Sequence, residues 1–207
     1  MSSTTSCKII SLNARGLAAR AKRHKLYAWF KKQKADIIFI QETHCTKSKL
    51  RTFKHSWDGM SFYGLTESAY SRGVGMLFRD GFDGNIIDYH ATFDGRQLLV
   101  NVEIENKLYT LVNIYSPNEE KKRISFLESL PQWIKRYSND NNNIIIGGDF
   151  NCCLTNADRS SKTHLADKSR DSMKNMINNL NLLDSWGEIK PYSTIHFTWS
   201  DYFLIYK

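Results

Sequence analysis

A carboxylate and a carboxamide follow a short apolar run near the middle of the second half of the chain. The run Ile144-Ile145-Ile146 ends in Gly147-Gly148, and Asp149 and Asn151 come directly afterwards. Consecutive β-branched residues favour a short strand buried on both faces. If the chain stays extended, Asp149 and Asn151 point to the same side, where a carboxylate orients a water and an amide holds an oxyanion. The same residue types form ordinary turns, so this stretch alone leaves a polar turn as the alternative.

A second polar cluster follows another apolar run. Residues Ala35 to Gln41 predict a buried strand, in which Ile38 and Ile40 share one face with Glu42. A glutamate that continues an apolar row is paired, lies at a strand end or ligates a metal. The stretch from Gln41 to His44 is therefore a second candidate for chemistry at the end of a strand.

Polar side chains recur at the ends of the predicted strands along the whole chain. They are Asn13, Glu42, Asn113 with Tyr115 and Asn118, Asp149 with Asn151, and Thr198. Several acceptor-rich strand ends suggest a site for a hard cation, because carboxylate and amide oxygens suit Mg²⁺ or Mn²⁺. A basic surface around such a site suits a phosphodiester substrate.

Composition narrows the class of protein. The 207 residues, 41% of them apolar, predict one domain over residues 1–207 with a core of its own. The net charge of +8 favours a polyanionic partner, such as nucleic acid or an anionic membrane surface. The four cysteines have no CxxC spacing, so we expect reduced thiols and an intracellular protein. No apolar run approaches the length of a membrane span, and the N-terminus has no signal-peptide pattern, so no membrane contact is expected.

The elements that must position these residues follow from periodicity. Helical stripes are predicted from Leu17 to Phe30, from about Asn118 to Tyr137 and around Met173 to Leu180. Pro131 should kink the second of these helices or split off its last turn. The remaining apolar segments predict strands, at 8–12, twice within 61–78, at 100–104 with its return at 108–115, and at 202–205. Short strands or extended pieces are also predicted at 182–186 and 195–199. Strand-rich halves, each with helices, favour two packed sheets flanked by helices.

Taken together, seven stretches resemble the endonuclease/exonuclease/phosphatase superfamily and, within it, the endonuclease domain of LINE-type retrotransposons. They occur in the family's order and span nearly the whole chain. The QETH, NIYSPN and GGDFN stretches are the most specific. The seven are Ser11 to Leu17, Gln41-Glu42-Thr43-His44, Asn113-Ile114-Tyr115-Ser116-Pro117-Asn118, Gly147-Gly148-Asp149-Phe150-Asn151, Asp158-Arg159, Phe197-Thr198-Trp199, and Asp201-Tyr202-Phe203-Leu204.

The resemblance implies a fold and a metal-dependent activity. The fold is a four-layer α/β/β/α sandwich of two mostly antiparallel sheets flanked by helices, and the activity is phosphodiester cleavage with Mg²⁺ or Mn²⁺. By motif, Glu42 would hold the metal with Asn13 beside it. Asp149 would orient or deprotonate the attacking water, and Asn151 would stabilise charge on the phosphorane oxygens.

The resemblance also implies how the substrate is held. Tyr115 and Asn118 would contact the phosphate region, and the side chains that would position DNA are Arg15, Arg159 and Thr198. Asp201 lies where the family keeps a carboxylate near the metal and the catalytic histidine. The implied partner is DNA, and the implied setting is the nucleus, for a domain that is a monomer when isolated and is normally fused to a reverse transcriptase.

Two features depart from the family's pattern. The family ends in a Ser-Asp-His motif on a further strand, and this sequence, which stops at Lys207, contains no such motif. Trp199-Ser200-Asp201 also joins two motifs directly, where the family has a hairpin. We therefore expect the last strand to be missing and DNA nicking to be impaired. The alternatives are a non-catalytic remnant that binds nucleic acid, and a superfamily phosphatase or RNA nuclease.

Overall fold

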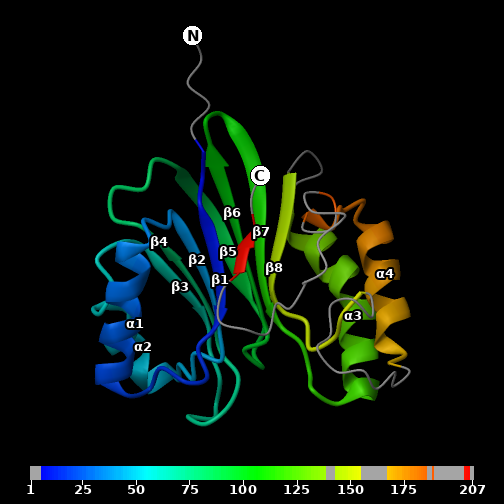
Figure 1. Ribbon diagram of the computed structural model, residues 1–207, viewed down its shortest axis with the longest axis horizontal. Coiled ribbons are helices and arrows are strands. Elements are labelled where there is room, and N and C mark those ends of the chain that lie inside the picture. The colour runs from blue at the N-terminus through cyan, green and yellow to red at the C-terminus, as the bar shows by residue number, and fades with distance from the viewer. Residues whose placement is uncertain (1–5, 139–142, 155–166, 186–187, 189–202, 206–207) are drawn as a thin grey trace.

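Two β-sheets stack face to face and helices cover their outer faces in the computed structural model of the chain (Figure 1). The structure describes residues 6–138, 143–154, 167–185, 188 and 203–205. The arrangement is the four-layer sandwich predicted from the sequence. Five of the seven strand pairings are antiparallel and two are parallel, so the sheets are mostly antiparallel, as expected.

The first sheet brings the N-terminal strand to a central place. Its order is β3-β4-β2-β1-β9, and only β1 and β2 pair in parallel. The strands are β1 (Ile9–Asn13), β2 (Ile37–Gln41), β3 (Ser61–Gly64), β4 (Val74–Phe78) and β9 (Phe203–Ile205). The predicted strand near the end of the chain is thus confirmed at 203–205, where it pairs with β1.

The second sheet contains the predicted hairpin. Its order is β5-β6-β7-β8, with β7 and β8 parallel. The strands are β5 (Asn85–Ala91), β6 (Gln97–Ile104), β7 (Lys107–Tyr115) and β8 (Asn143–Asp149). Strand β5 was not predicted, because most of its side chains are exposed and it has no buried face to give an apolar alternation.

Period-two alternation explains why β2 is buried throughout. Ile37 and Phe39 pack between the two sheets, whereas Ile38 and Ile40 pack under the helices of the first outer layer. These helices are α1 (Arg20–Lys32) and α2 (Leu50–Lys54), which follows the short 3₁₀ turn η1 (Lys47–Lys49). A strand with two buried faces reads as a continuous apolar run, which is why it is visible in the sequence.

The other outer layer consists of two helices packed on the second sheet. They are α3 (Glu120–Tyr137) and α4 (Ser169–Asn179). Leu127, Leu130 and Ile134 of α3 share a cluster with Met173 and Met176 of α4 and with the outer face of the sheet. The helix α3 continues through Pro131 to Tyr137, so the prediction that Pro131 splits off the last turn is wrong. Apolar side chains on both sides of Pro131 pack on the same sheet and keep the two parts in one helix.

The strand β8, which ends at Asp149, differs from its prediction. Ile144, Ile145 and Ile146 are half-buried rather than buried on both faces. In the part of the chain that the structure describes, β8 ends the second sheet and pairs only with β7, so one side of the strand has no neighbouring strand to cover it. Among the same residues, no helix has the length and apolarity that crossing a membrane requires.

Candidate active site

The parallel strand pairs bring four polar strand ends to one edge of the sandwich. In the first sheet Asn13 is in register with Gln41, and in the second sheet Tyr115 is in register with Asp149. Parallel strands place their carboxyl ends at the same edge, and stacking the sheets sets the two edges against each other. The residues that follow β1, β2, β7 and β8 therefore meet at one place.

Asn13 joins the two sheets at this edge. Its Nδ2 atom donates one hydrogen bond of 2.9 Å to Glu42 Oε1 and another of 2.9 Å to Asp149 Oδ2. The two carboxylate oxygens, which come from different sheets, thus lie no further apart than twice that distance. Asn13 Oδ1 accepts a hydrogen bond of 3.0 Å from the backbone N–H of Arg15, which fixes the orientation of the amide.

Glu42 reaches the edge because the chain leaves the strand there. β2 ends at Gln41, and Glu42 and His44 both have left-handed φ angles, of 51° and 55°. Of the three situations considered for this glutamate, two are found, since Glu42 follows the end of the strand and is paired with Asn13. The turn is pinned on both sides, since the N–H of Gly16 donates to Glu42 O (2.7 Å) and that of Thr43 donates to Gly73 O (2.8 Å).

Gly16 allows this turn to pack closely. Its φ is +87°, and a Cβ atom at this position would lie 2.7 Å from Nδ1 of His44. Both the backbone conformation and the space therefore call for glycine. The close packing holds the His44 ring beside Glu42, with His44 Nε2 3.9 Å from Glu42 Oε2.

His44 is kept neutral in this position. Burial lowers the pKa of the imidazole, the charge of Lys22 lowers it further, and the neighbouring Glu42 only partly offsets the shift. Its Nε2 atom is buried and has no hydrogen-bond partner among the described residues. A neutral ring with one open nitrogen beside a carboxylate is a feature that the motif stretch alone did not indicate.

Tyr115 lies over the same carboxylates. Burial raises the pKa of its hydroxyl to about 12, and a hydrogen bond with Glu42 and the negative charges of Glu42 and Asp149 act in the same direction. The hydroxyl is therefore protonated and donates to Glu42. Arg96 holds the tyrosine from the other side, since its guanidinium carbon lies 5.3 Å from the ring centroid and its Nη1 donates to Tyr115 O at 3.0 Å.

Asp149 and Asn151 do not lie on the same side of an extended strand, as was expected. The chain does not stay extended, because β8 ends at Asp149 and Asn151 has a left-handed φ of 52°. The backbone N–H of Asn151 instead donates to Asp149 Oδ1 at 3.0 Å, and Asn151 Nδ2 donates to Ser116 O at 2.7 Å. Both oxygens of Asp149 thus accept hydrogen bonds, and the amide of Asn151 is anchored to the loop after β7.

The residues predicted to contact the substrate are only partly within the described structure. Asn118 and Arg15 are exposed. The loop of Arg15 is held to α1 by Lys22, whose Nζ donates to Arg15 O at 2.8 Å. Arg159, Thr198 and Asp201 lie outside the described residues, so their places in the site stay predictions.

Asn113 belongs to the scaffold behind the site rather than to its surface. It is fully buried, and its Oδ1 accepts a hydrogen bond of 2.7 Å from Gln41 Nε2. Asn113 Nδ2 donates to Ile40 O (3.0 Å) and Gly75 O (2.8 Å) on the opposite sheet. The pair fixes the separation of the two sheets directly behind Glu42 and Asp149. Its signal in the sequence is a polar residue in the middle of an apolar strand, which has to be paired when buried.

The donor set suits one hard divalent cation in part. Mg²⁺ in proteins is usually held by one or two carboxylates, together with water and substrate phosphate, and Glu42 and Asp149 supply two carboxylates at one point. No group of three or more histidine, cysteine, aspartate or glutamate side chains with metal-binding geometry occurs among the residues that the structure describes. In this arrangement Asn13 donates hydrogen bonds from Nδ2 to both carboxylates. Its amide therefore orients the two carboxylates.

Comparison with known proteins agrees with this architecture. A family model described as the Endonuclease/Exonuclease/phosphatase family matches residues 10–207. The chain is 30% identical over 192 residues to the Transposon TX1 uncharacterized 149 kDa protein of Xenopus laevis, a match that covers 92% of this chain but only 14% of that protein. It is 24% identical over 225 residues to Exodeoxyribonuclease III of Haemophilus influenzae, covering 94% of this chain and 80% of the relative.

A solved structure shares the fold. An AP endonuclease from Archaeoglobus fulgidus superposes with a TM-score of 0.72 at 20% identity, and the match covers 91% of this chain and 76% of that one. At this identity the likeness concerns the fold alone. The features that bear on function must therefore be sought in the chain itself, at the edge where Asn13, Glu42, Tyr115 and Asp149 meet.

Proposed function

Because the chain belongs to the endonuclease/exonuclease/phosphatase family, we propose that it is a magnesium-dependent phosphodiesterase that nicks DNA, as the endonuclease domain of a LINE-type retrotransposon does. The similarity to a transposon protein and the net charge of +8 support a nucleic-acid substrate. Because the family also includes phosphatases and nucleases with other substrates, a phosphatase and an RNA nuclease are the competing functions.

One observation carries the proposal. The amide of Asn13 holds Glu42 of the first sheet and Asp149 of the second at hydrogen-bonding distance from a single atom. Two carboxylates gathered at an edge of the sandwich, with an amide donor between them, are residue types that can hold a cation and accept a proton. The hydroxyl of Tyr115 directed at Glu42 adds a neutral donor to the same place.

The metal would be held chiefly by Glu42, with the carboxylate of Asp149 facing the same place. Asp201 is proposed as a catalytic carboxylate near the metal. When bound, Mg²⁺ or Mn²⁺ neutralises charge on the scissile phosphate and polarises its oxygen. The protein's own contribution at this point is to orient Glu42. Asn13 and Tyr115 both donate hydrogen bonds to it, and these bonds fix the direction of its carboxylate oxygens.

The remaining residues would act on the water and on the phosphate. Asp149 is proposed to orient the attacking water and accept its proton, and its position is fixed by Asn13 and by the N–H of Asn151. Asn151 is proposed to donate to the oxygens on which charge develops. Loss of one such donor typically costs on the order of 10²–10³ in rate. Asn118, Arg15, Arg159 and Thr198 are proposed to position the DNA backbone.

Plasmid nicking tests the proposal. Two proteins are compared, the chain of residues 1–207 and the same chain followed by a strand that bears Ser-Asp-His, because the sequence contains no such motif. We expect Mg²⁺-dependent nicking by the second protein, and its loss in Glu42→Gln. Glu105→Gln, an exposed glutamate in the β6–β7 turn at the far end of the sheet, is the matched control.

Two results would contradict the proposal. One is the absence of nicking by both proteins at every metal concentration, and the other is nicking that Glu42→Gln leaves unchanged. Turnover of a DNA duplex, an RNA oligomer and an inositol phosphate, measured side by side, separates the DNA nickase from an RNA nuclease and from a phosphatase. DNA binding without any turnover, and insensitive to Glu42→Gln, would instead indicate a non-catalytic binding protein.

A further inference from the structure

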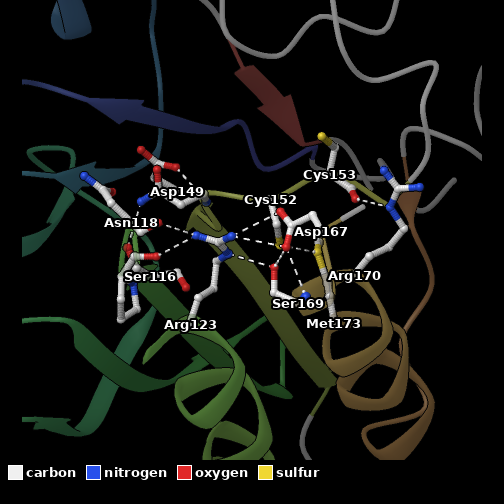
Figure 2. Close-up of polar contacts among 12 residues, drawn as sticks. Ser116, Asn118, Arg123, Asp149, Cys152, Cys153, Asp167, Ser169, Arg170 and Met173 are labelled. Atoms are coloured by element: carbon white, nitrogen blue, oxygen red, sulfur yellow. Dashed lines mark hydrogen bonds and ion pairs between the residues drawn. The ribbon is translucent and has the colours of Figure 1, made fainter. Parts of the chain in front are cut away.

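Side-chain hydrogen bonds hold the backbone of the Ser116–Asn118 segment, which follows β7 and lies outside regular secondary structure (Figure 2). The carbonyl of Ser116 accepts from Asn151 Nδ2 at 2.7 Å. The carbonyls of Pro117 and Asn118 both accept from Arg123 Nη1, at 3.1 Å and 2.7 Å. The N–H of Ser116 donates to Asp149 O at 2.8 Å. Side chains thus hold every carbonyl of a segment whose last residue, Asn118, is exposed and could bond to water instead.

Arg123 commits all of its nitrogens to this region. Besides the two carbonyls, its Nε donates to Ser169 Oγ at 2.7 Å and its Nη2 lies 3.2 Å and 3.1 Å from the two oxygens of Asp167. Only 7% of the arginine side chain is exposed. Figure 2 shows the guanidinium between the Ser116–Asn118 segment on one side and Asp167 with Ser169 on the other.

Asp167 keeps the arginine in place. Burial by itself raises the pKa of this carboxyl, but hydrogen bonds from Ser169 and Arg123 outweigh it and hold the pKa below the usual range. The carboxylate is therefore charged and also accepts from the N–H of Ser169 at 3.0 Å, at the start of α4. The five N–H donors of a planar guanidinium can serve the five acceptor atoms found here, whereas an ammonium has only three donors.

We propose that Arg123 is a positioning residue for the substrate contact made by Asn118. A buried arginine destabilises the folded state unless it is fully paired. Here Nε and Nη2 are paired with Ser169 and Asp167, and Nη1 is paired with two backbone carbonyls of one exposed segment. Arg123 fixes this segment from one end and Asn151 fixes it from the other, so Asn118 is presented at a set distance from Asp149. Asp167 acts one step further away by orienting the guanidinium. The inference rests on the proposed function, because it takes Asn118 to contact nucleic acid.

Arg123→Lys is the informative substitution. It keeps the positive charge beside Asp167 but removes Nη1, which holds two carbonyls while the other two nitrogens bond to Ser169 and Asp167. Arg136→Lys, an exposed position on the same helix, is the matched control. Dissociation constants for a labelled DNA duplex are measured in EDTA, so that binding is observed without cleavage. Asn118→Ala and the double variant complete a double-mutant cycle.

We expect Arg123→Lys and Asn118→Ala each to weaken binding by about tenfold, the effect of one hydrogen bond to a charged group. The double variant should bind no more weakly than Asn118→Ala alone, because Arg123 acts through Asn118. The order parameter of the Asn118 amide, from ¹⁵N relaxation, should fall in Arg123→Lys and stay unchanged in Arg136→Lys. Asp167→Asn, which leaves Arg123 in the chain, should reproduce the binding pattern if Arg123→Lys is poorly folded.

The outcomes that overturn the inference differ from the failure of the proposed function. Additive losses in the cycle, wild-type binding by Arg123→Lys, or an unchanged order parameter at Asn118 would each show that Arg123 only stabilises the fold. Failure of the wild-type chain to bind DNA would instead sink the proposed function, and with it the role of Asn118 as a substrate contact.

Discussion

Asn13 in the first sheet donates a 2.9 Å hydrogen bond to Asp149 in the second, although 136 residues separate them in the chain. The same nitrogen donates to Glu42. One neutral amide thus stands between two carboxylates that would otherwise face each other across the sheet edges. The arrangement separates like charges and holds Glu42 and Asp149 at the edge of the sandwich where a cation would lie.

Asn13→Asp should turn this donor into a third carboxylate of the same shape. In EDTA we expect Tm to fall by roughly 3–6 °C, because three like charges then share one place. Mg²⁺ should restore most of the loss, since an added carboxylate strengthens a hard-cation site. Thermal unfolding in EDTA and in Mg²⁺ measures both effects. Asn85→Asp, exposed on β5, is the control, and an equal Tm in the two buffers for Asn13→Asp would contradict the assignment.

Tyr115→Phe should remove a donor from Glu42 while keeping the ring that packs between the sheets. We expect nicking to fall on the order of 10²–10³, with a change in unfolding free energy within about 1.5 kcal/mol. The hydroxyl, with its pKa raised from 10.0 to about 12, stays protonated at all neutral pH values, so the wild-type rate should show no tyrosine titration there. Rate and urea unfolding, measured on both proteins, check this, and an unchanged rate would exclude the hydroxyl from catalysis.

His44 should make the fold sensitive to acid. Its pKa is lowered in the folded state by burial, from a model-compound value of 6.5, so the folded chain binds fewer protons than the unfolded one. The contribution of His44 to the free energy of unfolding is fully present above about pH 6.5, and it is lost as the pH falls below that value. Urea unfolding of wild type and His44→Gln from about pH 8 down to about pH 5 should show a smaller decrease in the variant. His24→Gln, exposed on α1, is the control, and parallel curves for all three proteins would refute the role of His44.

The sequence could predict which residues of the site lie at the ends of strands. Glu42, Tyr115 and Asp149 each follow an apolar run, and parallel pairing of β1 with β2 and of β7 with β8 brings such ends together. The local backbone at those ends could not be predicted, because the left-handed φ angles of Glu42 and Asn151 depend on contacts with the loops around Gly16 and Ser116. The alternation of apolar residues predicts the strand itself, but it carries no information on the backbone conformation of the residues that follow.

The spacing of apolar residues could not predict which polar side chains pair across long stretches of the chain. Arg123 appears in a helical stretch of mostly charged residues, and its partner Asp167 lies 44 residues further along the chain. The half-burial of β8 has a similar cause, since an isoleucine run is the same whether a strand lies in the middle of a sheet or at its end. The core, by contrast, was accessible, because β2 and α3 show their buried positions through the spacing of apolar residues.

Binding of Mn²⁺ tests most directly whether Glu42 and Asp149 form one metal site. The free ion is followed by electron paramagnetic resonance as it is titrated into wild type, Glu42→Gln, Asp149→Asn and the control Glu105→Gln, with no nucleic acid present. We predict a single site in the wild type and in Glu105→Gln, weakened by about tenfold or more in each of the two other variants. Equal binding by all four proteins, or none by any of them, would contradict a shared metal site at the meeting point of the two sheets.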